Sequence, residues 1–196
     1  MIKITYIKTS KDEKLLLLGI VEEGESRCYT ISQDVYSAIG SPLPHSEISE
    51  REMSIISYAD ELIRAEKKAL SLLSYADNNE RTLRSKLVRA GFSHEIASEI
   101  CEKMISLGYI NENRQLERLI LNEANFKLRG PKKIVPFLVA KGYNASDVRL
   151  VMSELSLSGE IDFKKNAERL IEKRLPADAT DEEKKKLLYR NGYEIC

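Results

Sequence analysis

The chain has 196 residues, of which 42% are hydrophobic, 32% are charged, 7% are aromatic and none is Trp. Its 31 Lys and Arg balance 31 Asp and Glu, so the formal net charge is zero. This composition indicates a folded globular protein and excludes a disordered chain. The longest apolar run, LLLLGIV at 15–21, is too short to span a membrane, and the N-terminus lacks the layout of a signal peptide.

The first thirty residues predict a small antiparallel β-meander. IKITYI at 2–7 alternates apolar and polar residues, LLLLGIV at 15–21 is a candidate for a buried strand, and RCYTI at 27–31 can pair with it. SQDVYSAIG at 32–40 then predicts a short helix with Ser32 as its N-cap.

From residue 46 the apolar residues recur with a period of about 3.6, which is typical of helices. Residues 46–76 predict one long helix or two abutting ones. Asn79 offers an N-cap for the next helix, which stops at Gly91. Ser93 caps a further helix, and 114–128 is helical again.

A hexapeptide occurs three times, as LVRAGF at 87–92, LVAKGY at 138–143 and LYRNGY at 188–193. The last copy is followed by a chain end at Cys196, as expected of a short terminal repeat. A gapless shift of fifty-one residues extends the match between the first two copies to nine pairs of positions: Leu83/Ile134, Leu87/Leu138, Gly91/Gly142, Phe92/Tyr143, Ile100/Val151, Met104/Leu155, Gly108/Gly159, Ile110/Ile161 and Asn111/Asp162. Apolar core positions and helix-ending glycines in this pattern predict a helical repeat whose units stack on their neighbours.

Little in the sequence points to catalysis. The two histidines, His45 and His94, lie in different segments, and neither has a metal-ligand spacing to Cys, Asp or Glu. No phosphate-binding glycine motif occurs. Cys28, Cys101 and Cys196 form no CxxC pair, which favours reduced thiols over a disulfide framework or a zinc site. We therefore expect a protein that is not an enzyme and that uses no cofactor or metal.

Charge is distributed unevenly along the chain. Residues 1–60 hold six Lys and Arg against ten Asp and Glu, whereas 61–196 hold twenty-five against twenty-one. The segment 124–146 contains no carboxylate and five cations: Lys127, Arg129, Lys132, Lys133 and Lys141. This pattern fits either a solvated helix face or a patch that binds an anion or a partner.

Within that segment, RGPKKI places Pro131 at the first position of a predicted helix. Its free N–H groups could hold a phosphate or a carboxylate of a partner, or they could have a purely structural role. The first unit, LRSKLVRAGFSHEIASEICEKM, also resembles a helix-turn-helix, a weak signal that any helical hairpin gives. If Leu83 and Leu87 are buried on one face, Arg81 and Arg84 should be exposed on another.

Four segments of the chain together resemble the RecX regulatory proteins of bacteria. They are KALSLLSYADNNERTLRSKLVRAGF at 68–92, MISLGYINENRQLERLI at 104–120, KLRGPKKIVPFLVAKGY at 127–143, and NAERLIEKR with KKKLLYRNGY at 166–193. The resemblance implies tandem three-helix repeats. The fold expected is therefore mainly α, an elongated curved array of such repeats behind a small N-terminal antiparallel β-meander. The domains expected are an N-terminal extension at 1–60 and repeats at 61–112, 113–162 and 163–196.

The resemblance also implies a function, which is to bind the RecA recombinase on the RecA–DNA filament and inhibit it in recombination, DNA repair and the SOS response. We expect a cytoplasmic monomer that contacts no membrane and at most contacts DNA weakly. The candidate contacts for RecA or filament DNA are the basic residues of the three units: Arg81, Arg84, Arg89, Lys127, Arg129, Lys132, Lys133, Lys141, Lys184, Lys185 and Lys186. The alternatives are a DNA-binding helix-turn-helix regulator and a purely structural scaffold.

The sequence departs from the usual RecX pattern at three places. Thr82 stands where a Glu is common, so the helix start must rely on Asn79 in place of a full capping box. Asn111-Glu112 replaces an Asp-rich pair, and Pro136 lies inside the predicted second-unit helix, where it should remove a hydrogen bond and kink the helix.

Overall fold

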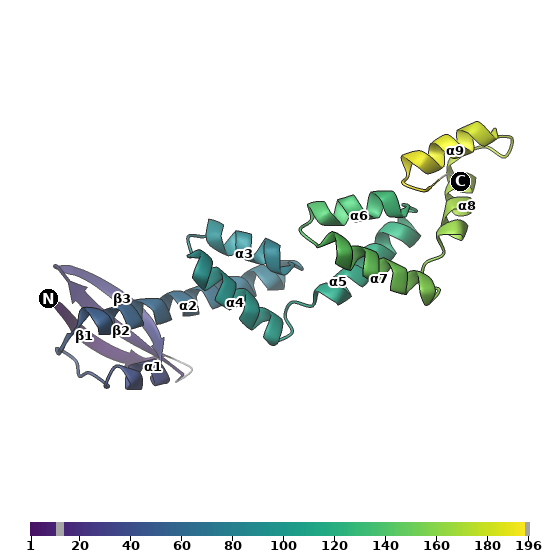
Figure 1. Cartoon of the computed structure of the whole chain (residues 1–196). Helices are drawn as coiled ribbons and strands as arrows, with labels where there is room; N and C mark the ends of the chain where they lie inside the picture. Colours follow the sequence, from purple (N-terminus) through teal and green to yellow (C-terminus); the bar gives the residue numbers. More distant parts are fainter. Residues whose placement is uncertain (11–13, 195–196) are drawn as a thin grey trace. The chain divides into compact units, whose positions relative to one another are not determined.

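The protein is described here by a computed structural model that covers residues 1–10 and 14–194 (Figure 1). The chain forms two compact units: Met1–Tyr75 with Arg84–Met104, and Ala76–Leu83 with Ile105–Cys196. We call them unit 1 and unit 2. The predicted fold class, mainly α with an antiparallel sheet at the N-terminus, is confirmed.

The N-terminal sheet of unit 1 is antiparallel and has the strand order β3-β2-β1-β4. Its strands are β1 (Ile2–Thr9), β2 (Leu15–Glu22), β3 (Glu25–Ser32) and β4 (Glu47–Ile48). The predicted meander corresponds to the first three strands. The sequence-based assignment of Ile48 to a helix was wrong, because Ile48 pairs with Ile2 across the sheet edge.

Two helices follow the meander, α1 (Gln33–Ala38) and α2 (Glu50–Tyr75). The predicted N-cap of α1 is confirmed, because Ser32 Oγ accepts a hydrogen bond from the Val35 N–H at 3.3 Å. The segment predicted as one or two helices is the single helix α2. It starts at Glu50 because Ser49 and Glu52 cap it reciprocally, with Glu52 N–H donating to Ser49 Oγ and Ser49 N–H to Glu52 Oε2.

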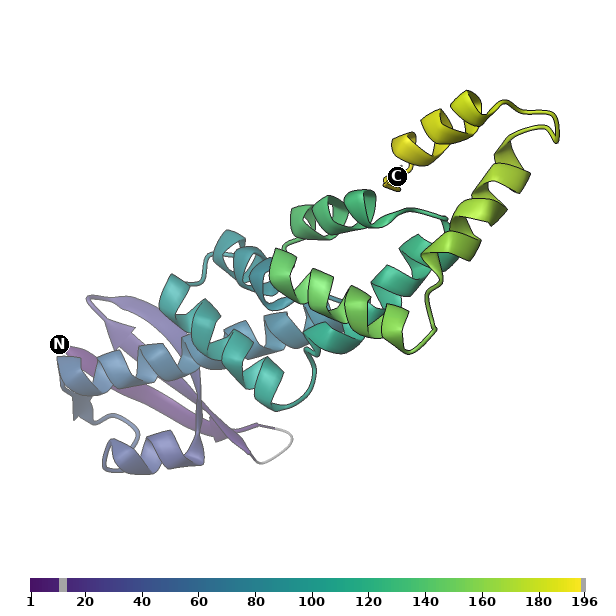
Figure 2. The ribbon, with the colours of Figure 1, turned by 45° about the vertical axis from the view of Figure 1, so that its right-hand side comes forward.

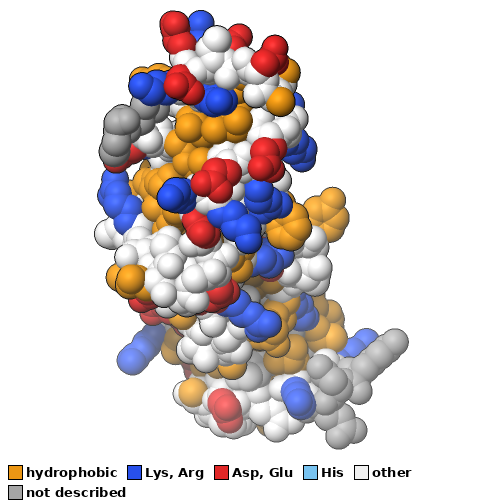
Figure 3. Space-filling view, turned by 90° about the vertical axis from the view of Figure 1, so that its right-hand side faces the viewer, with side chains coloured by type: hydrophobic (Ala, Val, Ile, Leu, Met, Phe, Trp, Pro, Cys, Tyr) orange, Lys and Arg blue, Asp and Glu red, His pale blue; other side chains and the backbone are white. Residues whose placement is uncertain are grey.

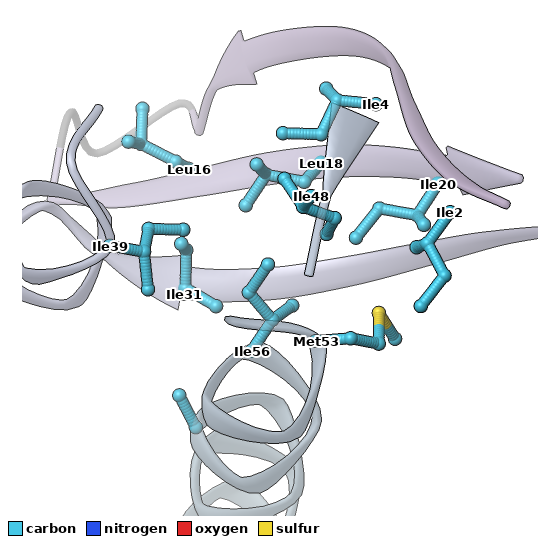
Figure 4. Packing of buried hydrophobic residues seen from close by; sticks show 11 residues of the cluster. Ile2, Ile4, Leu16, Leu18, Ile20, Ile31, Ile39, Ile48, Met53 and Ile56 are labelled. Carbon is cyan, nitrogen blue, oxygen red and sulfur yellow. The ribbon is translucent and has the colours of Figure 1, made fainter. Parts of the chain in front are cut away.

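The core of unit 1 lies between the sheet and α2. Met53 and Ile56 of α2 point toward the apolar residues of the sheet, among them Leu18 and Ile31 (Figure 4). Leu18, Ile31 and Ile56 are fully buried. Alternation along the strands and the helical period of α2 therefore place their apolar faces against each other.

The remaining helices are α3 (Glu80–Arg89), α4 (His94–Ser106), α5 (Glu112–Leu121), α6 (Pro131–Ala140), α7 (Ala145–Leu157), α8 (Phe163–Arg174) and α9 (Asp181–Arg190). A π-helical turn, η1 (Asn122–Phe126), continues α5, so the region predicted as helical at 114–128 is α5 plus η1. The starts of α3, α4 and α5 lie fifty-one residues before those of α6, α7 and α8. The spacing of the hexapeptides is thus the spacing of whole helices.

The nine matched pairs occupy equivalent structural positions. Leu83, Leu87, Ile134 and Leu138 are all fully buried. All the paired glycines have positive φ, for example +97° at Gly91 and +99° at Gly142. Gly192 of the third copy has a φ of +86°. The paired polar residues, Asn111 and Asp162, are both N-caps, of α5 and α8. The predicted N-caps Asn79 and Ser93 are also confirmed, because Asn79 Oδ1 accepts from Thr82 N–H and Ser93 Oγ from Ile96 N–H.

Unit 2 contains a core shared by α5, η1, α6 and α7, which lie side by side in both ribbon views (Figures 1 and 2). The buried residues of this core include Leu116, Ile120, Leu138 and Val148. Helix α6 continues through Pro136, whose side chain is exposed, so the proline removes one backbone donor without ending the helix. No helix in the described parts of the chain is long and apolar enough to cross a membrane.

Candidate functional site

In unit 2, three of the predicted site residues lie around one aromatic ring. Lys127 Nζ, Arg129 Cζ and Lys141 Nζ lie 5.7, 5.3 and 5.2 Å from the centroid of the Phe137 ring. Cations at such distances are attracted by the negative face of the ring. We call Glu123, Lys127, Arg129, Phe137 and Lys141 the Phe137 cluster. Phe137 is half-buried, whereas Lys127 and Lys141 are exposed to solvent.

A buried carboxylate anchors two of these cations. Glu123 is only 1% exposed, and its carboxylate accepts hydrogen bonds from Lys127 Nζ at 2.6 Å and Arg129 Nη1 at 2.5 Å. The backbone N–H of Arg129 also donates to the Glu123 carbonyl at 3.0 Å. Because the cluster contains three cations and one carboxylate, it keeps a net positive charge. Its cations are held by fixed partners, which reduces the entropy lost when they bind an anion.

The N-terminus of α6 does not provide the open anion site that the sequence suggested. Its first donors are taken by the turn after α9, because Gly130 N–H donates to the Asn191 carbonyl at 2.8 Å and Lys132 N–H to the Gly192 carbonyl at 3.0 Å. The approach is so close that a Cβ atom on Gly130 would lie 2.4 Å from the Gly192 oxygen. The prediction that the N–H groups around Pro131 are free is therefore wrong. These groups have a structural role, because they hold the turn that follows α9.

The N-terminus of α3 makes a corresponding contact within unit 2. Asn79 caps α3 with its Oδ1 and donates its Nδ2–H to the Lys141 carbonyl at 3.0 Å. Gly142, next to Lys141, is the glycine of the second hexapeptide, just as Gly192 is that of the third. In its second and third copies the hexapeptide is thus a connector between repeats. Its backbone carbonyls accept hydrogen bonds from residues at the start of the equivalent helix one repeat earlier.

The aromatic residues that end the second and third hexapeptides are buried. Tyr143 OH donates to Gln115 Oε1 at 2.9 Å, and Tyr193 OH donates to the Leu128 carbonyl at 3.2 Å. Burial raises the pKa of Tyr143 to about 12, and nearby Glu112 adds to this shift. Burial raises the pKa of Tyr193 to about 12 as well. The two hydroxyls therefore make structural hydrogen bonds within unit 2.

The other predicted contact residues are spread over the two units. Arg81 lies in unit 2 beside Gly142, whereas Arg84 and Arg89 belong to unit 1. Arg84 is half-buried, although the sequence predicted that it would be exposed. Two lysines have acidic neighbours, with Lys132 Nζ 3.3 Å from Glu194 and Lys184 Nζ 3.7 Å from Asp181. The remaining ones, Lys133, Lys185 and Lys186, are exposed.

Reasoning from the sequence missed Glu123 and Phe137. Both left a local signal, because Glu123 precedes Lys127 by one helical turn, and Phe137 precedes Lys141 by the same interval. No local signal linked the two pairs. The described residues contain no group of three or more His, Cys, Asp or Glu that could hold a metal ion. No disulfide joins Cys28 and Cys101, and Cys196 lies outside the described residues.

The fold and this site define a helical-repeat protein with a basic cluster on its surface. No protein-family model matches the chain. Over 145 residues it is 30% identical to the Regulatory protein RecX of Clostridioides difficile (strain 630), covering 74% of this chain and 66% of that protein. Over 175 residues it is 27% identical to the Regulatory protein RecX of Bacillus cytotoxicus, covering 89% of this chain and 64% of that protein. The matches thus span slightly less than two thirds of each relative's length.

Solved structures agree with these sequence matches. A crystal structure of a regulatory protein RecX superposes with a TM-score of 0.73 at 20% identity, covering 99% of this chain and 95% of the other. The structure of RecX from Lactobacillus salivarius gives a TM-score of 0.58 at 23% identity, covering 69% of this chain and 90% of the other. At these identities the superpositions show the shared fold. Together with the sequence matches, they establish that the chain belongs to the RecX family.

Proposed function

We propose that this protein binds RecA–DNA filaments in the cytoplasm and inhibits RecA activity in recombination, DNA repair and the SOS response. The observation that carries the proposal is the Phe137 cluster, a positively charged surface that is fixed by a buried carboxylate in a chain of the RecX family. Relatives in this family bear the name Regulatory protein RecX, which supports a regulatory role over a catalytic one.

The proposed contact is electrostatic. The side chain of Lys127 is 47% exposed although its ammonium group is paired with Glu123, so it can also reach a carboxylate or phosphate of a partner. Charge–charge attraction of this kind speeds association and weakens as salt rises, with a screening length of about 8 Å at physiological ionic strength. A filament presents the same surface many times, so contacts from several repeats can add up along it.

The alternative of a DNA-reading helix-turn-helix is less well supported by the geometry. In the hairpin of α3 and α4, the second helix would have to enter the major groove of DNA. Helix α4 carries three acidic residues against one lysine: Glu95, Glu99, Glu102 and Lys103. Its apolar face, including Ile96 and Ile100, is buried. Phosphates would repel such a helix, so sequence-specific duplex binding is not the function favoured here.

The test is RecA-dependent ATP hydrolysis on single-stranded DNA. We expect the wild-type protein to inhibit it and the double variant Lys127→Ala/Lys141→Ala to inhibit it about tenfold less, which corresponds to a loss of roughly 1.4 kcal/mol of binding free energy. This variant keeps the Arg129–Glu123 pair, which protects the fold. The matched control is Lys67→Ala/Lys68→Ala, which removes the same charge from exposed positions of α2.

Two results would argue against the proposal. Unchanged ATP hydrolysis at severalfold molar excess of the wild-type protein over RecA would refute RecA inhibition itself. Equal inhibition by the Lys127/Lys141 variant and by the control would refute the role of the Phe137 cluster. A gel shift with duplex DNA in the absence of RecA distinguishes the proposed function from the helix-turn-helix alternative. Only a helix-turn-helix regulator should bind a specific duplex without RecA.

A further inference from the structure

The backbone after η1 adopts a conformation that is unusual for a leucine. Leu128 has a φ of +54°, in the left-handed region where the Cβ atom of an L-residue crowds the following carbonyl oxygen. Such strain persists only where the surrounding structure enforces it. At the ends of α3, α4, α6, α7 and α9 the residue with positive φ is a glycine: Gly91, Gly108, Gly142, Gly159 and Gly192. Leu128 thus takes a position that glycine fills elsewhere in the repeats.

The left-handed residue closes the end of η1. Lys127 N–H donates to the Asn122 carbonyl at 3.1 Å, and Arg129 N–H donates to the Glu123 carbonyl at 3.0 Å. The second bond turns the backbone back over the end of η1, as at other helix ends that close with a left-handed residue just before the donor. The φ of Leu128 therefore sets the direction in which the chain leaves η1.

Lys127 and Arg129, which flank Leu128, converge on the same two groups. Lys127 Nζ and Arg129 Nη1 bind the Glu123 carboxylate at 2.6 and 2.5 Å. The same two cations lie 5.7 and 5.3 Å from the centroid of the Phe137 ring. In a helix that continued through Leu128, residues two positions apart would not face each other. The left-handed conformation of Leu128 thus brings the two cations together.

The turn after α9 holds Leu128 in this conformation. Tyr193 OH donates to the Leu128 carbonyl at 3.2 Å, and the side chains of Leu128, Leu170 and Tyr193 form a buried cluster. Gly130 N–H donates to the Asn191 carbonyl at 2.8 Å. Figure 3, which views the molecule from the side of α8 and α9, shows hydrophobic side chains at the surface next to basic ones. Relaxation of Leu128 to a negative φ would break the contacts with this turn.

We propose that Leu128 and Tyr193 are positioning residues for the Phe137 cluster. Tyr193 holds Leu128 in the left-handed conformation, and that conformation brings Lys127 and Arg129 into the cluster. When the Tyr193 contact is broken, Leu128 relaxes and the cluster comes apart, so the third hexapeptide controls whether this basic surface is formed. The inference rests on the function proposed above only for the use of the cluster, and it is tested without RecA.

NMR spectra of the full chain read the assembly of the cluster. The ε-methylene protons of Lys127 and Lys141 lie next to ammonium groups that are placed over the Phe137 ring, whose ring current shifts such protons upfield. The Phe137→Leu variant removes the ring and gives the unshifted reference. Exchange of the Arg129 amide is the second readout, because this N–H donates to the Glu123 carbonyl. We expect upfield-shifted lysine protons and a protected Arg129 amide in the wild-type protein.

Removal of the Tyr193 hydroxyl tests its contact with Leu128. Tyr193→Phe should reduce the upfield shift of Lys127 and speed exchange of the Arg129 amide about fivefold, as expected for the loss of one hydrogen bond. The matched control is Tyr143→Phe, which removes the corresponding hydroxyl of the second hexapeptide in the same unit. This control should leave both readouts unchanged.

Two substitutions of Leu128 separate positioning from ordinary packing. Leu128→Ala and Leu128→Gly both remove the buried side chain, but only glycine adopts a positive φ without steric cost. If Leu128 served only in packing, Leu128→Gly would be the more disruptive change, because glycine loses more conformational freedom on folding. Positioning through φ predicts the opposite order. Leu128→Gly should keep the larger Lys127 shift, and its Arg129 amide should exchange about tenfold more slowly than in Leu128→Ala.

Three results would overturn the proposal. They are an unchanged Lys127 shift in Tyr193→Phe, an equal loss of that shift in the Tyr143→Phe control, and a smaller shift in Leu128→Gly than in Leu128→Ala. A failure of the protein to inhibit RecA would leave all of these measurements unaffected, so the two proposals fail separately.

Discussion

Replacing Gly130 with Ala tests the connector between the third hexapeptide and the start of α6. Gly130 has a φ of −83°, which any residue can adopt, so the substitution strains no backbone dihedral. Its new Cβ would lie 2.4 Å from the Gly192 oxygen and 2.5 Å from the Gly192 carbonyl carbon. Because both are backbone atoms, the turn after α9 must move away as a whole.

The magnitude follows from what that movement breaks. The two hydrogen bonds from Gly130 N–H and Lys132 N–H are lost, at about 1 kcal/mol each. Partial exposure of the Tyr193 ring, now 6% accessible, adds about 1–2 kcal/mol. We therefore expect Gly130→Ala to lower the free energy of unfolding of unit 2 by about 3 kcal/mol.

Urea unfolding and amide hydrogen exchange measure this effect. The control is Gly91→Ala, where φ is +97° and no atom lies near the new Cβ, so only backbone strain of about 1–2 kcal/mol applies. Gly130→Ala should speed exchange of the Lys132 amide about a hundredfold, while Gly91→Ala should not change it. The reasoning would be refuted if the Lys132 amide stayed protected in Gly130→Ala.

Four further predictions concern stability. The folded-state pKa of Tyr143 and Tyr193 is about 12, above the ordinary 10.0, so the fold favours the neutral phenols. Their contribution to the free energy of unfolding is complete below pH 10 and is lost as pH rises toward 12. Urea unfolding measured at several pH values should show a smaller loss of stability at high pH in Tyr143→Phe and Tyr193→Phe. Pro136→Ala restores a helix donor at an exposed site and should raise the thermal midpoint, with a gain of about 1–3 kcal/mol; a lower midpoint would contradict this. Glu123→Gln keeps the shape but removes the charge that holds Lys127 and Arg129, and should cost about 1–2 kcal/mol in urea unfolding, whereas no change would mean that both pairs are fully screened. Thr180→Ala removes the capping box of α9 and should cost about 1 kcal/mol, seen as faster amide exchange at the start of α9 and not of α8.

Local features of this fold were predictable from sequence because their causes are local. Ser32, Asn79 and Ser93 cap helices through bonds to residues three positions away. The buried leucines and the positive-φ glycines of the hexapeptides follow from helical period and from the freedom of Gly to end a helix.

Features that depend on distant partners were not predictable. Ile48 fits a helical period, and only its pairing with Ile2 makes it a strand. The basic segment appeared free of carboxylates, but Glu123 lies just before it and its burial depends on tertiary packing. Likewise, the Gly192 carbonyl accepts a hydrogen bond from Lys132 N–H at the start of α6, although Gly192 lies about sixty residues further along the chain. The N–H groups that the sequence predicted to be free are therefore occupied in the fold.

Co-sedimentation with RecA filaments assembled on single-stranded DNA tests the proposed function most directly. We expect the wild-type protein and the Lys67→Ala/Lys68→Ala control to pellet with the filaments at low salt and to be released as salt rises. The Lys127→Ala/Lys141→Ala variant should remain largely in the supernatant. Wild-type protein that stays in the supernatant at every salt concentration, while RecA and DNA pellet, would contradict the proposal that it acts by binding the filament.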